Sequence, residues 1–287
     1  MIRLDLLGSF SLFDGQGLPV AVPTKKNRAL LAILALTAAG HATRDQLCAL
    51  LWGDRRADQA RSSLRQSLAM LRKELGDHEG LVMHTYDDVV ALRLKSLQVD
   101  AREFQRLSVL HDITALRQAA ALYRGELLAD TSIRDAAFEE WLAAARRRLV
   151  DKAMTAFERL AGLETGQLAI DAAKRLVDLD PLREASHRIL MSVYAAAGEK
   201  GLAIKHYEAC AMILKAELGV APGEDLQELR RSLAADTPVG RVGNQDAKPS
   251  IAVLPFEHLS RDPETRYFSD GITGDIITEL SRFNHCA

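Results

Sequence analysis

Basic and amide side chains are concentrated between residues 55 and 73. This stretch has a single acid, Asp58, and six basic residues: Arg55, Arg56, Arg61, Arg65, Arg72 and Lys73. Arginine, serine and glutamine side chains can hydrogen-bond to the edges of DNA bases and to phosphate oxygens. The chemistry indicated here is recognition of a polyanion by charge and hydrogen bonding.

An amphipathic helix over about residues 58–75 is predicted to carry these side chains. Its apolar stripe is Leu64, Leu68, Leu71 and Leu75, and these spacings place the four leucines on one helical face. The opposite face presents Arg61, Ser62, Arg65 and Gln66 near the N-terminal end, where helices in a major groove meet bases. We predict that these four residues contact bases. The alternative is an ordinary amphipathic helix with a solvated basic face.

The elements around this helix occur in an informative order. Residues 2–13 alternate as in strands, Thr24 is predicted to cap a helix that runs to about Ala39, and Thr43 with Gln46 forms a capping box for the next helix. Two apolar stretches at 81–83 and 89–94 flank a turn and predict a hairpin behind the basic helix. A sheet, three helices and a hairpin in this order predict a DNA-binding winged helix-turn-helix over residues 1–97.

A second set of basic residues lies at helix starts or on the flank of the basic helix. We predict phosphate contacts for Lys25, Lys26, Arg28, Arg44, Arg72 and Lys73. The turn of the hairpin reads Tyr86-Asp87-Asp88, and two acids at that tip would repel phosphate. Contacts from the wing are therefore less expected than contacts from the helix.

Residues 98–235 are predicted to be almost entirely helical, with helices over 113–128 and 136–163. Leu168-Ala169-Ile170 recurs as Leu202-Ala203-Ile204, an offset of 34 residues that is the tetratricopeptide period. Between the two copies, Asp180 and Pro181 are predicted to start a helix that Gly198 ends. The sequence as a whole predicts a mainly α fold with a small β component, in which the winged helix precedes a tetratricopeptide-like helical repeat domain.

Both regions resemble one family of bacterial regulators. Leu6-Leu7-Gly8, Arg28-Ala29-Leu30-Leu31, Leu51-Trp52-Gly53 and Leu71-Arg72 resemble the OmpR-type winged helix of Streptomyces antibiotic regulatory proteins (SARPs). Leu179-Asp180-Pro181-Leu182-Arg183-Glu184, Tyr207-Glu208 and Glu217-Leu218-Gly219-Val220 resemble the bacterial transcriptional activator domain of the same family. The resemblance implies a role in activation, oligomerisation or partner contact for 98–235, and paired direct-repeat DNA sites.

The end of the chain has a different composition. Residues 236–249 are predicted to be a linker, and 250–287 resemble the start of a TolB-like α/β domain with one strand and one helix. About 40 residues bury little core. We therefore expect 250–287 to be an incomplete segment or one completed by a partner.

Composition excludes several classes of protein. The 287 residues have a net charge of −2, with 48% hydrophobic and 26% charged residues, which is typical of globular domains. Cys48, Cys210 and Cys286 have neither disulfide nor metal-ligand spacing, and no apolar run reaches membrane-spanning length. No phosphate-binding glycine loop and no catalytic triad can be assigned, and His187 and His206 are expected to be ordinary helix residues. We expect no cofactor, no metal, no enzymatic activity, no receiver domain and a cytoplasmic location.

The sequence leaves open two functions from different classes. The first is a sequence-specific transcriptional regulator, an activator, that binds double-stranded DNA, contacts RNA polymerase and forms homo-oligomers on direct repeats. The second is a helical-repeat scaffold or a regulatory fragment of a larger signalling protein, such as a cyclase-linked chain, that acts through protein contacts. The basic face from Arg61 to Lys73 favours the first.

Overall fold

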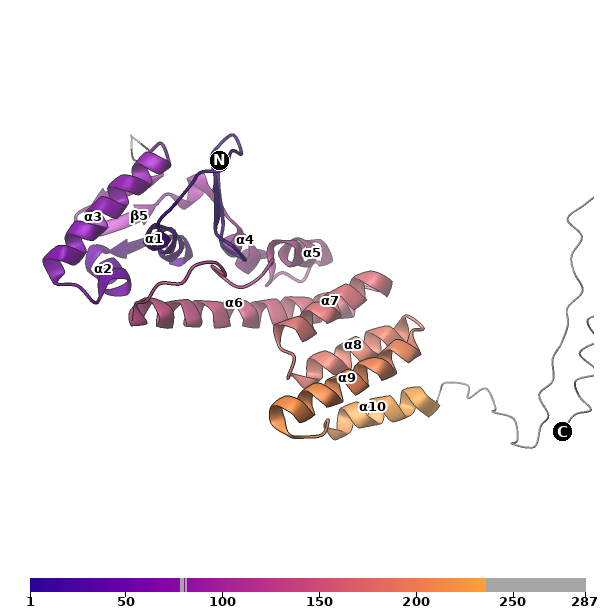
Figure 1. Ribbon diagram of the computed structural model, residues 1–287. Coiled ribbons are helices and arrows are strands. Elements are labelled where there is room, and N and C mark those ends of the chain that lie inside the picture. The colour runs from indigo at the N-terminus through magenta and orange to yellow at the C-terminus, as the bar shows by residue number, and fades with distance from the viewer. Residues whose placement is uncertain (78–79, 81, 236–287) are drawn as a thin grey trace, which may run out of the picture. The chain divides into compact units, whose positions relative to one another are not determined.

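The computed structural model describes residues 1–77, 80 and 82–235, and it confirms the predicted mainly α fold with small sheets (Figure 1). The N-terminal helices are α1 (Lys25–Leu36), α2 (Arg44–Trp52) and α3 (Ala57–Glu74). The later helices are α4 (Asp100–Leu107), α5 (Ile113–Leu122), α6 (Ala136–Leu163), α7 (Gly166–Leu179), α8 (Glu184–Ala196), α9 (Lys200–Leu218) and α10 (Glu224–Ala235). The predicted linker at 236–249 and the TolB-like segment at 250–287 lie outside the described residues.

Two small sheets frame the three N-terminal helices. The first has the order β2-β1-β6, in which β1 (Ile2–Asp5) pairs antiparallel with β2 (Ser11–Phe13) and parallel with β6 (Leu97–Val99). The second has the order β3-β5-β4, in which β4 (Met83–Tyr86) and β5 (Val89–Leu92) form the predicted hairpin. A strand that sequence analysis did not predict, β3 (His41–Thr43), pairs with β5 and attaches the start of α2 to the hairpin.

The helix starts follow the predicted capping chemistry. The side chain of Thr24 accepts a hydrogen bond from the backbone of Asn27 and so caps α1. Thr43 and Gln46 form the complete capping box of α2, with each side chain bound to the other's backbone N–H. These caps fix the directions in which α1 and α2 leave the sheets, and α3 packs on both.

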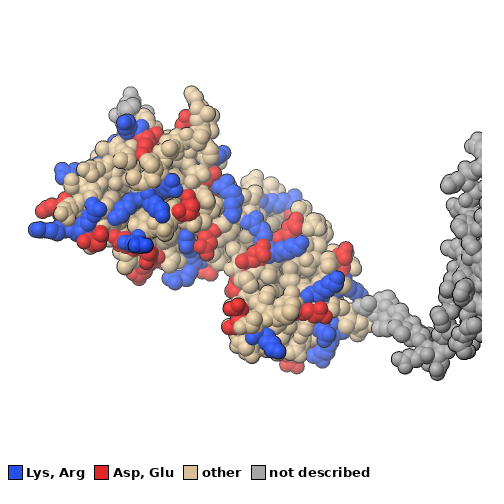
Figure 2. Space-filling model, viewed as in Figure 1, with Lys and Arg blue, Asp and Glu red and all other residues tan. Residues whose placement is uncertain are grey.

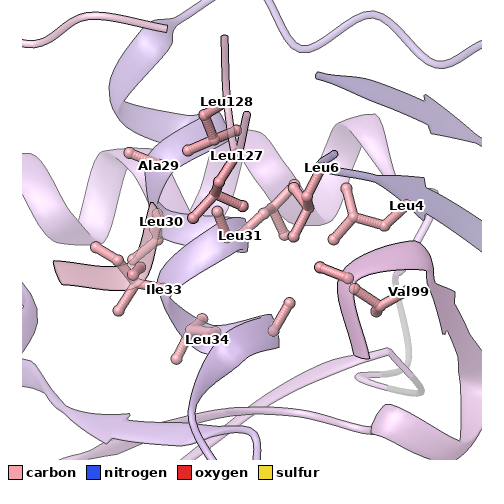
Figure 3. Close-up of a cluster of buried hydrophobic side chains, with 14 of the residues drawn as sticks. Leu4, Leu6, Ala29, Leu30, Leu31, Ile33, Leu34, Val99, Leu127 and Leu128 are labelled. Atoms are coloured by element: carbon pink, nitrogen blue, oxygen red, sulfur yellow. The ribbon is translucent and has the colours of Figure 1, made fainter. Parts of the chain in front are cut away.

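One hydrophobic core runs through the winged helix and into the first helices that follow it. Figure 3 shows Leu127 and Leu128 among side chains of β1, α1 and β6, such as Leu31 and Val99. Leu127 and Leu128 are at most 1% exposed, although they lie some 30 residues beyond the predicted boundary at 97/98. The winged helix therefore completes its core with residues of the helical region.

A buried carboxylate fastens this junction. Asp100 is 4% exposed and accepts hydrogen bonds from the backbone N–H groups of Leu6 (2.7 Å), Leu7 (3.0 Å) and Ala101 (2.6 Å). Arg124 donates to the same carboxylate at 3.0 Å and also pairs with Asp5 at 3.1 Å. Burial raises the pKa of Asp100, while the N–H donors of Leu7 and Leu6 oppose that shift.

The helical region is a stack in which each helix packs on its chain neighbour (Figure 1). The repeated triplets occupy equivalent environments: Leu168 and Leu202 are exposed, while Ala169 and Ala203 are buried against the neighbouring helices. Small residues at these buried positions allow close approach of the helices, as a tetratricopeptide-like stack requires. This finding supports the predicted repeat.

Three predicted helix boundaries are wrong. The helix that Thr24 caps, expected to run to about Ala39, ends at Leu36. The helix expected over 113–128 ends at Leu122, because Leu127 pairs with Leu7 across a β-bridge and Leu128 turns into the core with a φ of 51°. The helix expected to start at Asp180-Pro181 starts at Glu184 instead. Asp180 ends α7, and its carboxylate accepts the N–H of Leu182 in a local turn.

His187 and His206, expected to be isolated helix residues, form a pair between α8 and α9. The Nδ1 of His187 lies 3.0 Å from the Nε2 of His206, and the Nε2 of His187 donates to the carbonyl of Pro181 at 2.8 Å. His187 therefore accepts from His206 through Nδ1 when both rings are neutral. Burial, together with the charge of His187, lowers the pKa of His206 to about 4, and the ring of Tyr194 packs edge-on against it.

The histidine pair predicts acid sensitivity of the helical stack. Between pH 6.5 and 4 the unfolded chain takes up a proton at His206 that the folded chain excludes. The free energy of unfolding is therefore highest above about pH 6.5 and decreases as the pH drops towards 4. Because His206 is partly solvated, we expect a loss of about 1–2 kcal/mol at pH 5. Urea unfolding at pH 7.5 and 5, compared with His206→Gln, measures this. Equal pH dependence of the two proteins would contradict it.

Candidate nucleic-acid interface

The structure places the four predicted base-contacting residues together on the outer face of α3. Its inner face buries Ala60, Leu64, Leu68 and Leu71. Arg61, Arg65 and Gln66 are exposed on the outer face, and Ser62 is half-buried beside them. Within the described part of the chain, Arg65 and Gln66 have no hydrogen-bond partner in another side chain. Both are free to bond an external ligand.

Arg61 differs from its neighbours because it has a partner within the protein. Its Nη2 lies 3.0 Å from Oδ1 of Asp45, in the first turn of α2, and the two side chains are 59% and 65% exposed. An ion pair this exposed contributes only about 0.2–1 kcal/mol. A phosphate or a base edge can therefore compete with Asp45 for Arg61.

The hairpin behind α3 is fixed to it as a wing. Arg72 of α3 donates to the hydroxyl of Thr85 in β4 at 3.2 Å, so this predicted phosphate contact also joins the helix to the wing. The carboxylate of Asp77 accepts the N–H groups of Val82 (3.1 Å) and Met83 (2.7 Å) at the wing's base. At the tip, Asp87 has a φ of 48° and Tyr86 is 48% exposed.

Three of the remaining predicted phosphate contacts are accessible. Lys73 is exposed on α3, and Lys25 is exposed at the start of α1, with its Nζ 3.4 Å from the hydroxyl of Ser132. Arg44 is half-buried and lines a hollow with Arg61 and Arg65, which also contains the acids Asp58 and Asp88. These acids lower the positive charge on the wing side of α3.

Lys26 and Arg28 are committed inside the protein instead. Lys26 donates to the carbonyl of Leu51 at the end of α2 and lies 5.3 Å from the ring centroid of Trp52, and burial lowers its pKa. Arg28 donates to the carbonyl of Val22 at 2.8 Å and pairs with Asp130 at 3.2 Å. Breaking these contacts to reach a phosphate would leave polar groups unpaired, so both residues are less available to a phosphate than Lys25 or Lys73.

Charge on the visible face of this region is mixed but predominantly basic around the helices. Figure 2 shows Lys and Arg side chains gathered over the region of α1 and α2, with Asp and Glu between and below them. Sequence analysis did not predict the roles of Asp45 and Asp130, because each pairs with an arginine on a different element. The one local sign was that Asp45 follows the Thr43 cap by two residues and so lies in the first turn of the helix that precedes the basic helix.

The fold and this helix face define a winged-helix protein with an appended helical repeat module. The family model described as "Bacterial transcriptional activator domain" matches residues 87–234, more than half of the chain, and the chain belongs to that family. The match begins within the wing hairpin.

Curated relatives and a solved structure agree with this assignment. The chain is 29% identical to the regulatory protein AfsR of Streptomyces coelicolor over 270 residues, covering 88% of this chain and 26% of that protein. It is 28% identical to the transcriptional regulator RedD of S. coelicolor, over 84% of this chain and 73% of that protein. The structure of Mycobacterium tuberculosis EmbR, with a low-affinity phosphopeptide, has the same fold, with a TM-score of 0.59 at 21% identity over 98% of this chain and 72% of EmbR. The predicted resemblance to SARP-type regulators is confirmed.

A short segment has a different relative. Over 36 residues, 12% of the chain, the sequence is 72% identical to putative adenylate cyclase 3 of Rhizobium meliloti, of which this covers 6%. The chain thus spans only a small part of some of its relatives and about a quarter of AfsR. In the part of the chain that the structure describes, no helix is long and apolar enough to cross a membrane.

The Arg61–Asp45 pair predicts a variant with stronger DNA binding. Asp45→Asn removes a negative charge beside the outer face of α3 and frees Arg61. Affinity for random-sequence duplex DNA should rise about fivefold, because one surface charge near phosphates is worth on the order of 1 kcal/mol. Fluorescence anisotropy with a labelled duplex measures this. Asp171→Asn on α7 makes the same charge change far along the chain and should have no effect; an equal gain in both variants would refute a local role.

Proposed function

We propose that this chain is a sequence-specific transcriptional activator that places α3 in the major groove of double-stranded DNA. The observation that carries the proposal is the outer face of α3, on which Arg65 and Gln66 are exposed and have no side-chain partner among the described residues, while Arg72 bonds the helix to the wing behind it. Arginine and glutamine can each make paired hydrogen bonds to a base edge. The regulators among the relatives support the same reading.

Each residue of the proposed interface has a defined task. Arg65 and Gln66 read bases, with Ser62 beside them and with Arg61 once it leaves Asp45. Lys25, Arg44, Arg72 and Lys73 hold phosphates on the flanks of α3. Recognition of this kind is non-covalent and needs no cofactor. From the regulators among the relatives we infer that the chain is not itself an enzyme and that it acts in the cytoplasm, where bacterial DNA lies.

The helical stack is proposed to carry the second half of the function. A single winged helix covers few base pairs, and linking two reading heads raises the effective concentration of the second. We propose that α7–α10 either join copies head to tail on direct repeats or contact RNA polymerase. Binding to a DNA site with two repeats distinguishes these roles. A steep dependence of binding on protein concentration supports contacts between copies. If the two repeats are filled independently, contact with RNA polymerase becomes the better account.

A direct test of base reading uses sites selected from a random DNA pool. On the selected site, Arg65→Ala should weaken binding by about 1–3 kcal/mol if Arg65 contacts a guanine, with relaxed preference at that base pair. Arg147→Ala removes an exposed arginine from α6 and is the matched control, with no loss expected. Failure to select any sequence, or equal affinities for the Arg65 variant and the unaltered chain, would refute the proposal.

The alternative is a helical-repeat scaffold or a regulatory fragment of a larger signalling protein that acts through protein contacts, and the short match to putative adenylate cyclase 3, over 12% of the chain, is the observation that keeps it in view. Salt dependence distinguishes the two. If Lys25, Arg44, Arg72 and Lys73 each neutralise a phosphate, the logarithm of the binding constant for random duplex should fall with a slope of about −4 against the logarithm of salt concentration. Lys73→Gln should reduce the slope by about one. Binding that is absent, or independent of salt, would favour the protein-contact function.

A further inference from the structure

A hollow of about 440 Å³ lies beside α3, on the side away from the wing. Its walls are the start of α1, the end of α2, the flank of α3 and the loop before α6. The residues that matter here are Lys25, Lys26, Asn27, Arg55, Ser63 and Ser132. Three of them are cationic, and none of the described residues that line the hollow is an acid. This charge balance distinguishes it from the hollow on the wing side, which contains Asp58 and Asp88.

The start of α1 supplies a second source of positive potential. The helix has 12 residues and no acid in its first turn, so nothing within that turn offsets its positive end. The side chain of Thr24 caps the N–H of Asn27 and leaves the N–H groups of the first two residues without a partner inside the helix. Backbone N–H groups in this arrangement bind anions.

Asn27 is a second, independent observation that points to a ligand site at this hollow. This residue lines the hollow and is only 1% exposed, yet its side-chain Nδ2 has no acceptor among the residues that the structure describes. Buried amide groups are normally hydrogen-bonded, and a buried donor without a partner is costly. An anion bound in the hollow would bring acceptor oxygens close to the Asn27 side chain.

The cations are held around the hollow by contacts within the protein. Arg55 donates to the hydroxyl of Ser63 at 2.9 Å, and Lys25 lies 3.4 Å from the hydroxyl of Ser132. Lys26 is anchored on the carbonyl of Leu51, so its charge is a fixed part of the wall. Ser132 belongs to the loop before α6, and the hollow therefore joins the winged helix to the helical region.

We propose that this hollow is a phosphate site, which binds one phosphate group through the start of α1, Lys25 and Arg55. The group belongs either to the DNA backbone beside α3, in which case the site rests on the function proposed above, or to a free phosphorylated small molecule. The volume exceeds that of a phosphate alone and leaves room for an attached sugar. Because the hollow borders α3, its occupant contacts the helix that reads bases.

The test is a titration of the isotopically labelled full chain, followed by NMR. Inorganic phosphate is added at constant ionic strength, and a random-sequence duplex is added in a separate series. Saturable shifts of the backbone amides of Lys25 and Lys26 and of the Asn27 side-chain amide are expected in at least one series. Arg55→Gln should weaken that binding at least fivefold. Arg147→Gln removes the same charge from an exposed position on α6, outside the hollow, and should leave inorganic phosphate binding unchanged.

The two series also identify the source of the phosphate. Shifts of these amides by the duplex, with loss of inorganic phosphate binding in its presence, assign the site to the DNA backbone. Inorganic phosphate binding that persists in the presence of the duplex assigns it to a free phosphorylated ligand. Absence of saturable shifts in both series, or unaltered binding by Arg55→Gln, overturns the proposal. None of these outcomes depends on base reading by Arg65, so the site and the proposed function can fail separately.

Discussion

The buried carboxylate of Asp100 is the contact on which the presentation of α3 depends. It binds the backbone N–H groups of Leu6 and Leu7, which continue from β1, and it is itself held by Arg124 from beyond α5. A buried charge is stable only when it is paired and hydrogen-bonded. Loss of any of these partners would therefore loosen the first sheet from the helical region, and with it the support beneath α1 and α3.

Three arginines also join the winged helix to the helical region, or neighbouring helices to one another, by donating hydrogen bonds to backbone carbonyls of another element. Arg102 of α4 donates to the carbonyls of Ala35, Thr37 and Ala38 at the end of α1. Arg146 of α6 donates to the carbonyls of Leu127 and Leu128, and Arg175 of α7 to those of Ala120 and Tyr123. Each guanidinium satisfies carbonyls that lack helical partners. These hydrogen bonds join the winged helix and the first repeat helices into one packed unit, which supports the proposed DNA-reading helix α3.

Local patterns predicted much of this fold. The caps at Thr24 and Thr43, the leucine stripe of α3 and the limits of α6 all depend on neighbours a few residues away, and each is found as predicted. What the sequence could not show are contacts between distant residues. Asp45 beside Arg61, Asp130 beside Arg28 and Leu127 beside Leu7 each join different elements. These contacts decide which basic residues remain free for a ligand. The composition of the candidate site therefore could not be predicted from the sequence alone.

Native-state hydrogen exchange of the full chain under increasing denaturant tests the central claim, that the unit presenting α3 extends into the helical region. Exchange in peptides covering α1, the segment 124–130 and the first half of α6 should merge into one opening reaction with a common free energy and a common denaturant dependence. An opening that exposes α1 at a lower free energy, while the first half of α6 stays protected, would show that the winged helix unfolds alone and would contradict the account.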